Sequence, residues 1–523
     1  MTRKSTALVK YPFTKAIADQ IINMWNNNVW SGTDGITAWD VDVTVSTTAA
    51  LNSAIVTAIG ANRALKTRIK LSSGFTNTTA TTISFNGNAT NGNLIGAGGA
   101  LLIEPETTRV NINSLVNING IRGLKIRGVT FSRTVSDHGG SLNWVPGDGG
   151  IDPMDTNAFV VQRNSSRPLW SIVHFEDCYF GGGFSANPTQ AANPLDWMIA
   201  CTLTYAEEIY MKNCKFKGAK LGVKLNNVRR FKADNPDFQQ IVGDCMTNMN
   251  SDTLILSENI RTLYPNDQNV YTWINGMTVR NLFDNATQLS ADLRDRQFWN
   301  EHSDMIQHGT STDTIGNKCL IENFMCYAER ATYKDVSNSR MTAAPQGIYL
   351  DDTNMNLVTV IRNSLIAASS VWTIKGWNGS TYIDNCTVVR VGSMAPSATL
   401  GANGFNETVD PKPKVSATQK TGYRGSIRVR NCILGEINTP SGTGYEGSML
   451  SQSNNIIANP TIGTANYSSI FKGTFTTDSE GRNVYTFTDD GESTQELFRQ
   501  ALYNQFAPKT EYRIYGVKNP QIW

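Results

Sequence analysis

The sequence has few charged residues and no long hydrophobic run. Charged residues make up 17% of the 523 residues, against about 25% in typical domains. The formal net charge is only +2, and no basic block is longer than Val228–Lys232. No stretch approaches the ~18 apolar residues of a membrane-spanning helix. These absences argue against charge-driven disorder, a nucleic-acid groove and a membrane span.

Paired cysteine motifs are also missing. The eight cysteines contain no C-x-x-C pair and have no histidine partners at zinc spacing. Four of them, Cys178, Cys214, Cys386 and Cys432, directly follow an Asp or Asn. This recurring context predicts a small, buried, reduced side chain at one repeated structural position, not a disulfide framework. Residues 1–10 lack the apolar core of a signal peptide, so we expect no ordinary secretion route.

What the chain has in excess is asparagine, with 52 residues, and part of this excess belongs to a repeat. The repeated unit is a short run of alternating apolar positions, then Asn or Asp (Gly in one copy), then a second apolar strand. Copies lie at residues 124–131, 173–180, 209–216, 277–283, 319–324, 358–365, 382–386 and 427–432. Each unit is too short to bury its own apolar face, so it must stack on its neighbours.

The spacing of the repeat predicts an all-β fold, a right-handed parallel β-helix with rungs of about 22 residues. The anchor residues are Asn213, Asn235, Asn259, Asn281, Asn323, Asn363, Asn385 and Asn431, spaced by 22, 24, 22, 42, 40, 22 and 46 residues. Asn suits a sharp bend because it tolerates the left-handed backbone region. Together with Gly128, these anchors imply about ten rungs. Leucine-rich repeats and propellers fit worse, because their signatures are missing.

Three regions follow from this pattern: residues 1–46 for attachment or trimer contact, 47–464 for the β-helix, and 465–523 for a tail and possible trimerisation segment. Within 47–63 the apolar spacing predicts a short helix that caps the solenoid, followed by a strand at 67–71. The first region carries Trp25, Trp30 and Trp39. The aromatic residues of the tail, which we expect a partner subunit to bury, are Phe498, Tyr503, Phe506, Tyr512, Tyr515 and Trp523.

Residues 45–460 resemble the pectate-lyase-like β-helix superfamily, and within it bacteriophage tailspike and depolymerase proteins. The resemblance rests on the Asn-anchored rungs, the helix-then-strand entry, and the segments Glu301–His308 and Gln346–Asp352. Segments similar to the first occur in that superfamily on the strand face that binds carbohydrate. The resemblance therefore implies a carbohydrate groove on one face of the β-helix.

Strand alternation independently predicts a column of outward side chains on one face. The inward residues are expected to be Val223, Met246, Ile306, Ile348 and Ile374. Their outward neighbours, the candidate substrate-binding residues, are Lys224, Thr247, Gln307, Tyr349 and Lys375. His308 is a further candidate for substrate contact, although an interior histidine is the alternative. Outward lysines such as Lys224 and Lys375 are often simply solvated.

The candidate catalytic residues are His302, Asp304, Tyr349, Asp351 and Asp352. In a lyase, one group neutralises the uronate carboxylate, a base removes the C5 proton, and Tyr349 protonates the leaving oxygen. In a hydrolase, Asp304 with Asp351 or Asp352 supplies the two carboxylates at ~5–9.5 Å. The same aspartates could instead bind Ca²⁺. Alternatively, Asp304 caps a turn and Asp351–Asp352 is an ordinary turn pair.

The preferred functional hypothesis is a phage tailspike-like homotrimer that binds and depolymerises a bacterial surface polysaccharide. It would assemble in the host cytoplasm, reside in the virion, and join other tail proteins through residues 1–46. One alternative is a free, secreted polysaccharide lyase of the pectate or alginate type. Another is a virion fibre or adhesin that binds glycan without cleaving it. No nucleic-acid partner and no membrane span are expected.

Overall fold

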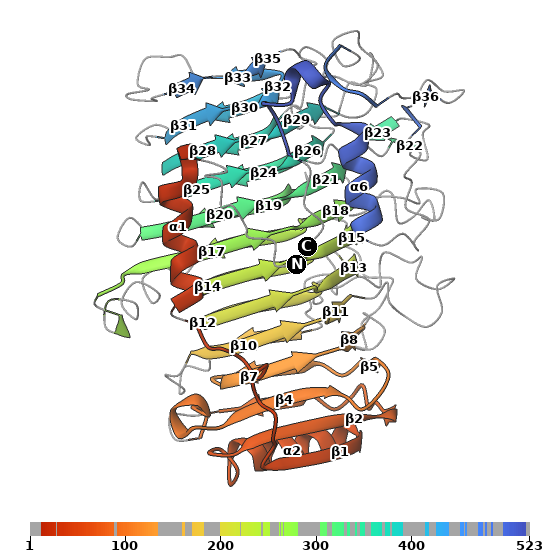
Figure 1. Ribbon diagram of the computed structural model, residues 1–523. Helices are drawn as coiled ribbons and strands as arrows, with labels where there is room; N and C mark the ends of the chain where they lie inside the picture. The colour runs from red at the N-terminus through yellow and green to blue at the C-terminus, as the bar shows by residue number, and fades with distance from the viewer. Residues whose placement is uncertain are drawn as a thin grey trace, which may run out of the picture.

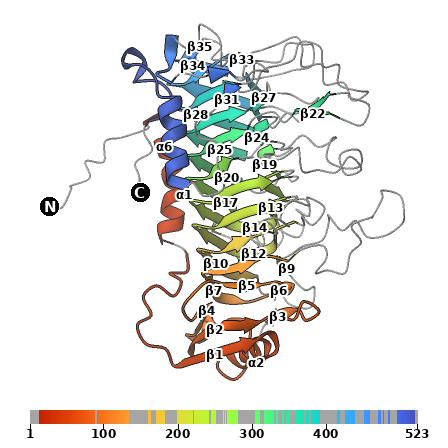
Figure 2. The same ribbon diagram turned by 90° about the vertical axis from the view of Figure 1, so that its right-hand side faces the viewer.

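The chain is a parallel β-helix with three strand faces, shown in the computed structural model of Figures 1 and 2. The described residues are 12–27, 29–87, 91–133, 159–162, 170–181, 199–219, 221–241, 244–250, 261, 263, 264, 266–280, 304–310, 316–328, 332–334, 340–342, 346–350, 357–368, 372–376, 379–390, 414–417, 425–438, 450–453, 455–457, 469–473, 476–477, 483–484 and 495–518. Two helices, α1 (Pro12–Asn27) and α6 (Gln495–Gln505), run along the stack on different faces.

The first face, which we name the α1 face, is the one covered by α1. Its strands are β1 (Val41–Thr47), β2 (Lys66–Thr76), β4 (Ala100–Pro105), β7 (Arg122–Arg127), β10 (Ser171–Glu176), the second halves of β12 (Cys201–Lys212) and β14 (Val223–Asp234), β17 (Asn269–Asn275), β20 (Gly316–Glu322), β25 (Leu357–Arg362), β28 (Gly379–Asp384), β31 (Gly425–Arg430) and β34 (Leu450–Ser453).

The second face, the open face, carries no helix among the described residues. Its strands are β3 (Ile83–Asn86), β6 (Val116–Asn119), β9 (Phe159–Gln162), the first halves of β12 and β14, β16 (Met246–Asn250), β19 (Asp304–Thr310), β24 (Gln346–Leu350), β27 (Trp372–Gly376), β30 (Lys414–Ala417) and β33 (Glu436–Asn438). Strands β12 and β14 run through both faces and turn at Tyr205 and Asn227, which have φ of 51° and 56°.

The third face, the α6 face, is a separate 11-stranded sheet. Its strands are β5 (Val110–Ile112), β8 (Val129–Phe131), β11 (Tyr179–Phe180), β13 (Lys215–Ala219), β15 (Asp237–Ile241), β18 (Thr278–Arg280), β21 (Met325–Ala328), β26 (Leu365–Ala368), β29 (Thr387–Arg390), β32 (Ile433–Leu434) and β35 (Ile456–Ile457). Two antiparallel hairpins, β22–β23 (Thr332–Lys334, Arg340–Thr342) and β36–β37 (Thr476–Thr477, Asn483–Val484), lie outside the three faces.

Like side chains stack from rung to rung in the interior of the solenoid. Phe131, Phe180, Phe216 and Phe238 form a column of stacked rings on successive strands of the α6 face, with centroid separations of 5.1, 5.2 and 4.6 Å. Apolar residues from all three faces join this interior in one continuous core. A solenoid needs such a core because no single rung can bury its own apolar side.

The bend between the α1 face and the α6 face is the predicted asparagine position. Left-handed φ values between 49° and 55° occur there at Asp177, Asn213, Asn235, Asn323, Asn363, Asn385 and Asn431. The side chains bond from rung to rung: the Nδ2 of Asn363 donates to the Oδ1 of Asn323 at 2.7 Å, and the Nδ2 of Asn323 donates to the Oδ1 of Asn275 at 2.8 Å. The predicted role of asparagine is thus confirmed at these rungs.

One part of the repeat count was wrong. The bend that follows Asn235 is Gly276, with φ 70°, because β14 pairs directly with β17 and β15 with β18. Asn259 and Asn281, which the sequence count used as anchors, lie outside the described residues. The chain between consecutive bends is therefore longer in this region than a 22-residue rung, and the apparent regular spacing there was coincidental.

The N-terminal end of the β-helix is covered by the chain itself. Helix α2 (Thr48–Ile59) confirms the predicted cap, and its N-terminus is fixed by the Thr47 hydroxyl, which accepts a bond from the Ala50 N–H at 3.1 Å. Strand β1 already pairs with β2, so the first rung begins at Val41. Helix α1, which the sequence analysis did not predict, packs Ile21 and Trp25 against the α1 face.

The aromatic tail differs from expectation. Phe498 and Phe506 are buried against Leu365, Ile433 and other residues of the α6 face in the same chain. Tyr503, Tyr512 and Tyr515 pack on the same cluster, while Trp523 lies outside the described residues. For Phe498 and Phe506 the expectation of a partner subunit was wrong, because the β-helix of their own chain buries them, whereas the three tyrosines are half-buried.

All eight cysteines are buried and unpaired, as the sequence indicated. Cys178, Cys214, Cys386 and Cys432 each follow a bend residue, and each side chain points into the core. Burial raises the pKa of the Cys178 thiol to about 12, so this group stays protonated near neutral pH. These thiols are therefore packing residues of the solenoid and not reactive groups.

Candidate functional site

The open face carries the column of outward residues that the sequence predicted. Strand register places Lys224 beside Thr247, Thr247 beside Gln307, Gln307 beside Tyr349, and Tyr349 beside Lys375. The same register extends the column in both directions. In rung order the additional members are Ser84, Asn117, Val160 and Thr202 before Lys224, and Ser416 and Asn438 after Lys375. Apart from Val160, every member can hydrogen-bond.

The middle of this column is accessible to a ligand. Lys224 is exposed, and Gln307 and Tyr349 are half-buried. Thr247 is 7% exposed, and its hydroxyl donates to the Oδ2 of Asp244 at 3.1 Å. Only the backbone of Lys375 is described. Neighbouring strands lie ~4.8 Å apart, so successive members offer polar groups at a regular repeat along the solenoid axis.

Two predicted site residues point the other way. Asp304 and His308 lie on the same side of β19 as Ile306, which faces the core. Asp304 is only 2% exposed, and its backbone N–H donates to the Oδ1 of Asp244 at 2.8 Å. Asp304 is the first residue of β19, and its burial removes it as an accessible acid or base on the open face.

His308 is fully buried, so the prediction that it contacts substrate was wrong. Its ring lies 3.4 Å from the side-chain nitrogen of Asn317. Burial lowers the pKa of His308 to about 4, which keeps the imidazole neutral near neutral pH. It is the satisfied interior histidine that was the alternative.

The remaining catalytic candidates, His302, Asp351 and Asp352, lie outside the described residues. Their roles as acid, base or calcium ligands stay predictions, as does the carboxylate spacing required for a hydrolase. Within the described parts of the chain, no cluster of three or more His, Cys, Asp or Glu side chains could hold a metal ion. Of the catalytic candidates, only Tyr349 is described and partly accessible.

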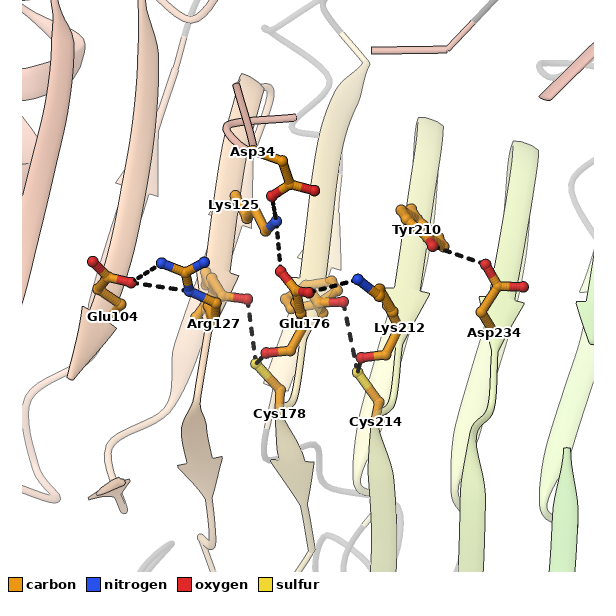
Figure 3. Close-up of polar contacts among 12 residues, drawn as sticks. Asp34, Glu104, Lys125, Arg127, Glu176, Cys178, Tyr210, Lys212, Cys214 and Asp234 are labelled. Carbon is orange, nitrogen blue, oxygen red and sulfur yellow. Dashed lines mark hydrogen bonds and ion pairs between the residues drawn. The ribbon is translucent and has the colours of Figure 1, made fainter. Parts of the chain in front are cut away.

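A second polar feature, on the α1 face, was not found from the sequence. The residues directly before the bends from Arg127 onward, together with Lys70 and Glu104 on the two preceding rungs, form a ladder. The sign of charge alternates between neighbouring rungs except at Asn275, and Figure 3 shows the members from Glu104 to Asp234. In rung order the ladder consists of Lys70, Glu104, Arg127, Glu176, Lys212, Asp234, Asn275, Glu322, Arg362, Asp384 and Arg430. Opposite charges therefore meet at most steps, which penalises any shift of strand register.

The contacts of Glu176 show how tightly the ladder is coupled. Its carboxylate lies 2.8 Å from the Nζ of Lys212 and 2.6 Å from the Nζ of Lys125. Burial alone would raise the pKa of Glu176, but the bonds from the two lysines outweigh it and lower the pKa to about 2. At Asn275 the alternation is interrupted, and this amide donates to the Oδ1 of Asp234 at 3.2 Å.

The sequence contains a signal for this ladder. Each of its members from Arg127 onward immediately precedes a bend residue, so the charges could be read once the bends were identified. Two adjacent charges of opposite sign on neighbouring rungs, such as Glu322 and Arg362, are 40 residues apart in sequence. Local sequence patterns therefore cannot identify these charge pairs, which can be recognised only after the rungs have been aligned.

Comparisons with known proteins give no family assignment. No family model matches the chain, and no curated protein sequence matches it. A solved structure of a rhamnogalacturonan lyase aligns over 86% of this chain and 91% of its own, with 8% identity and a TM-score of 0.30. The fold therefore rests on the strand pairing described above. No helix in the described residues is long and apolar enough to cross a membrane.

Proposed function

We propose that this protein binds an extended bacterial surface polysaccharide along its open face and depolymerises it, in the manner of a phage tailspike. The observation that carries the proposal is the column from Ser84 to Asn438, which is polar at each described rung except that of Val160 and lies on a face that neither α1 nor α6 covers. An extended chain needs a binding surface of this shape, because successive sugars must each find hydrogen-bonding groups.

The side chains in the column favour an acidic polysaccharide. Lys224 is exposed and could pair with a carboxylate of the ligand, and strand register places a second lysine, Lys375, beside Tyr349. Between them, Gln307 supplies an amide and Tyr349 an aromatic ring with a hydroxyl. Aromatic rings with a polar end are common in binding sites because they combine apolar contact with a hydrogen bond.

Cleavage would be elimination or hydrolysis, and the two give different products. Elimination fits an acidic substrate, with Tyr349 placed to protonate the leaving oxygen and the base supplied from a residue beyond the described ones. A lyase produces an unsaturated uronate that absorbs in the ultraviolet, whereas a hydrolase produces reducing ends alone. Purified protein incubated with a panel of capsular and O-antigen polysaccharides therefore separates the two reactions.

Variants on the open face test the binding proposal. Gln307→Ala and Tyr349→Ala should each weaken binding of the responsive polysaccharide about 5- to 150-fold, which corresponds to the loss of about 1–3 kcal/mol of polar and ring contacts. Tyr503→Ala on α6, which lies over another face, is the matched control and should leave affinity unchanged. Unchanged binding by both open-face variants would contradict the proposal.

A binding-only role is the second candidate, and the burial of Asp304 and His308 favours it. Asp304 was expected to supply acid–base chemistry on the open face, and His308 was expected to contact the substrate. If polysaccharides bind with neither unsaturated product nor new reducing ends, the protein is a glycan-binding fibre.

In either role we propose a homotrimer that is attached to the virion through its N-terminal residues. Light scattering should then give three times the monomer mass of 57.4 kDa, and a stable monomer mass would contradict the proposal.

A further inference from the structure

A cavity of about 220 Å³ lies on the α1 face, under the segment that connects α1 to β1. Its floor is formed by β7, β10, β12 and β14, and its wall by Trp25, Trp30 and Asp34 of the N-terminal segment. The open-face column lies on different strands or strand halves of the solenoid, so this cavity is separate from the site proposed above.

The wall of the cavity is fixed by several contacts. The centroids of the Trp30 and His174 rings lie 4.7 Å apart, and the backbone N–H of Trp30 donates to the Oε1 of Glu208 at 3.3 Å. Asp34 forms an ion pair with Lys125 of the floor, shown in Figure 3. Gly32 has φ 72°, and a side chain there would press on the His174 ring, so the segment approaches the sheet closely at this point. The cavity is therefore preformed.

The lining of the cavity includes hydrogen-bond donors that a ligand could use. Lys212 bonds Glu176 and Lys232 bonds Asp234, each at 2.8 Å, so each ammonium keeps N–H donors beyond that contact. The indole N–H of Trp25, a residue 4% exposed, has no hydrogen-bond partner among the described residues. A buried donor without a partner is costly, and a bound acceptor would remove that cost.

Flat apolar surfaces accompany these donors. Trp25 and Trp30 contribute indole rings, and Tyr210 contributes its ring from the floor while its hydroxyl donates to the Oδ2 of Asp234 at 2.8 Å. Drug-sized ligands occupy pockets of ~300–1,000 Å³, so a cavity of this volume accepts about one sugar ring. Aromatic walls and ammonium donors together suit a ring that carries a carboxylate.

We propose that this cavity is a second ligand site, and that it binds a single acidic sugar residue of the uronic acid class. The carboxylate pairs with Lys212 and Lys232, and the ring lies against Trp30. The proposal does not depend on the open face: a protein that fails to bind polysaccharide there could still bind a uronate in this cavity, and the reverse also holds.

Isothermal titration calorimetry of the full chain tests the site with galacturonic acid and glucuronic acid. Glucose lacks the carboxylate and acetate lacks the ring, so both should bind at least about tenfold more weakly than the uronates. Lys212→Met should weaken uronate binding about 10- to 100-fold, the effect of losing one charge-assisted bond. Trp30→Ala should weaken uronate binding by a similar factor. Lys66 is an exposed lysine on the same face, and Lys66→Met should leave uronate binding unchanged.

Three outcomes would overturn the proposal. The first is no heat of binding with either uronate, and the second is equal binding of glucose or acetate. The third is loss of uronate binding in Tyr349→Ala but not in Lys212→Met, which would place the sugar on the open face. Thermal unfolding of each variant is recorded alongside; because Glu176 keeps its contact with Lys125 in Lys212→Met, this variant should retain the parent fold.

Discussion

Replacing Asn323 should show how much the asparagine bends stabilise the solenoid. The side chain makes two bonds, at 2.8 Å to Asn275 and at 2.7 Å from Asn363, and the backbone has φ 55°. Two hydrogen bonds are worth roughly 1–3 kcal/mol together. An alanine in the left-handed region costs roughly 1–2 kcal/mol more. We therefore expect Asn323→Ala to lower the free energy of unfolding by about 2–5 kcal/mol.

Asn323→Gly separates the two causes. Glycine adopts this φ without strain but loses both side-chain bonds and adds some entropy to the unfolded chain. It should therefore be less destabilising than alanine, by about 1 kcal/mol. Urea unfolding followed by circular dichroism, with midpoint and slope both measured, provides the comparison. Asn504→Ala, at an exposed helical position, is the control and should stay within about 0.5 kcal/mol of the parent. The reasoning fails if both bend variants match this control, or if glycine is the worse of the two.

Three further predictions concern charge and burial. The pKa of Glu176 is about 2 in the folded protein and 4.5 in the unfolded chain. Its contribution to the free energy of unfolding is therefore complete above pH 4.5 and is lost as the pH falls toward 2. The shift in pKa corresponds to about 3.4 kcal/mol, which solvent screening reduces to roughly 1–2 kcal/mol. Glu176→Gln should therefore reduce the loss of stability at acid pH by that amount. An unchanged acid limb of the stability–pH profile would refute this prediction. Arg280→Met should lower the free energy of unfolding in urea by about 3–5 kcal/mol, because it leaves the buried carboxylate of Asp237 without its 2.9 Å ion pair. A decrease of less than 1 kcal/mol would contradict this prediction. Thiol titration should find all eight cysteines unreactive in the folded protein and reactive in denaturant without reductant, whereas fewer than seven would indicate disulfides.

The sequence was sufficient for the fold because both of its determinants are local. Strand alternation can be read within one unit, and the bend asparagine follows its strand directly, as at Asn213 and Asn385. Between Asn235 and Asn323, the information that assigns residues to rungs is not contained in the local sequence. Insertions there contain asparagines of their own, and only the pairing of β14 with β17 identifies Gly276 as the bend.

The candidate site was predictable in part for the same reason. Register and alternation placed Gln307 and Tyr349 together on the open face. The same alternation, counted from Ile306, places His308 inside, and its burial confirms that position. Helix α1 has a helical pattern of buried residues, which includes Ala18, Ile21 and Trp25, but no repeat in its sequence relates it to the strands that it covers.

Packing between distant segments could not be predicted from the sequence. The N-terminal segment contacts strands more than 100 residues away, as in the bond between Trp30 and Glu208. Arg499 of α6 donates to the carbonyl of Asn323 at 2.9 Å, which holds the tail on the bends of the solenoid. Neither segment carries a repeat, so nothing in the sequence aligns them with a particular rung.

Hydroxyl-radical footprinting with a bound polysaccharide tests the central claim most directly. Tyr349 on the open face and Tyr503 over the α6 face are both half-buried and share the same intrinsic reactivity. With saturating polysaccharide, Tyr349 should be protected from oxidation while Tyr503 is oxidised at the rate seen in the free protein. Protection of Tyr503 with no change at Tyr349 would show that the polysaccharide lies on another face, which contradicts the account.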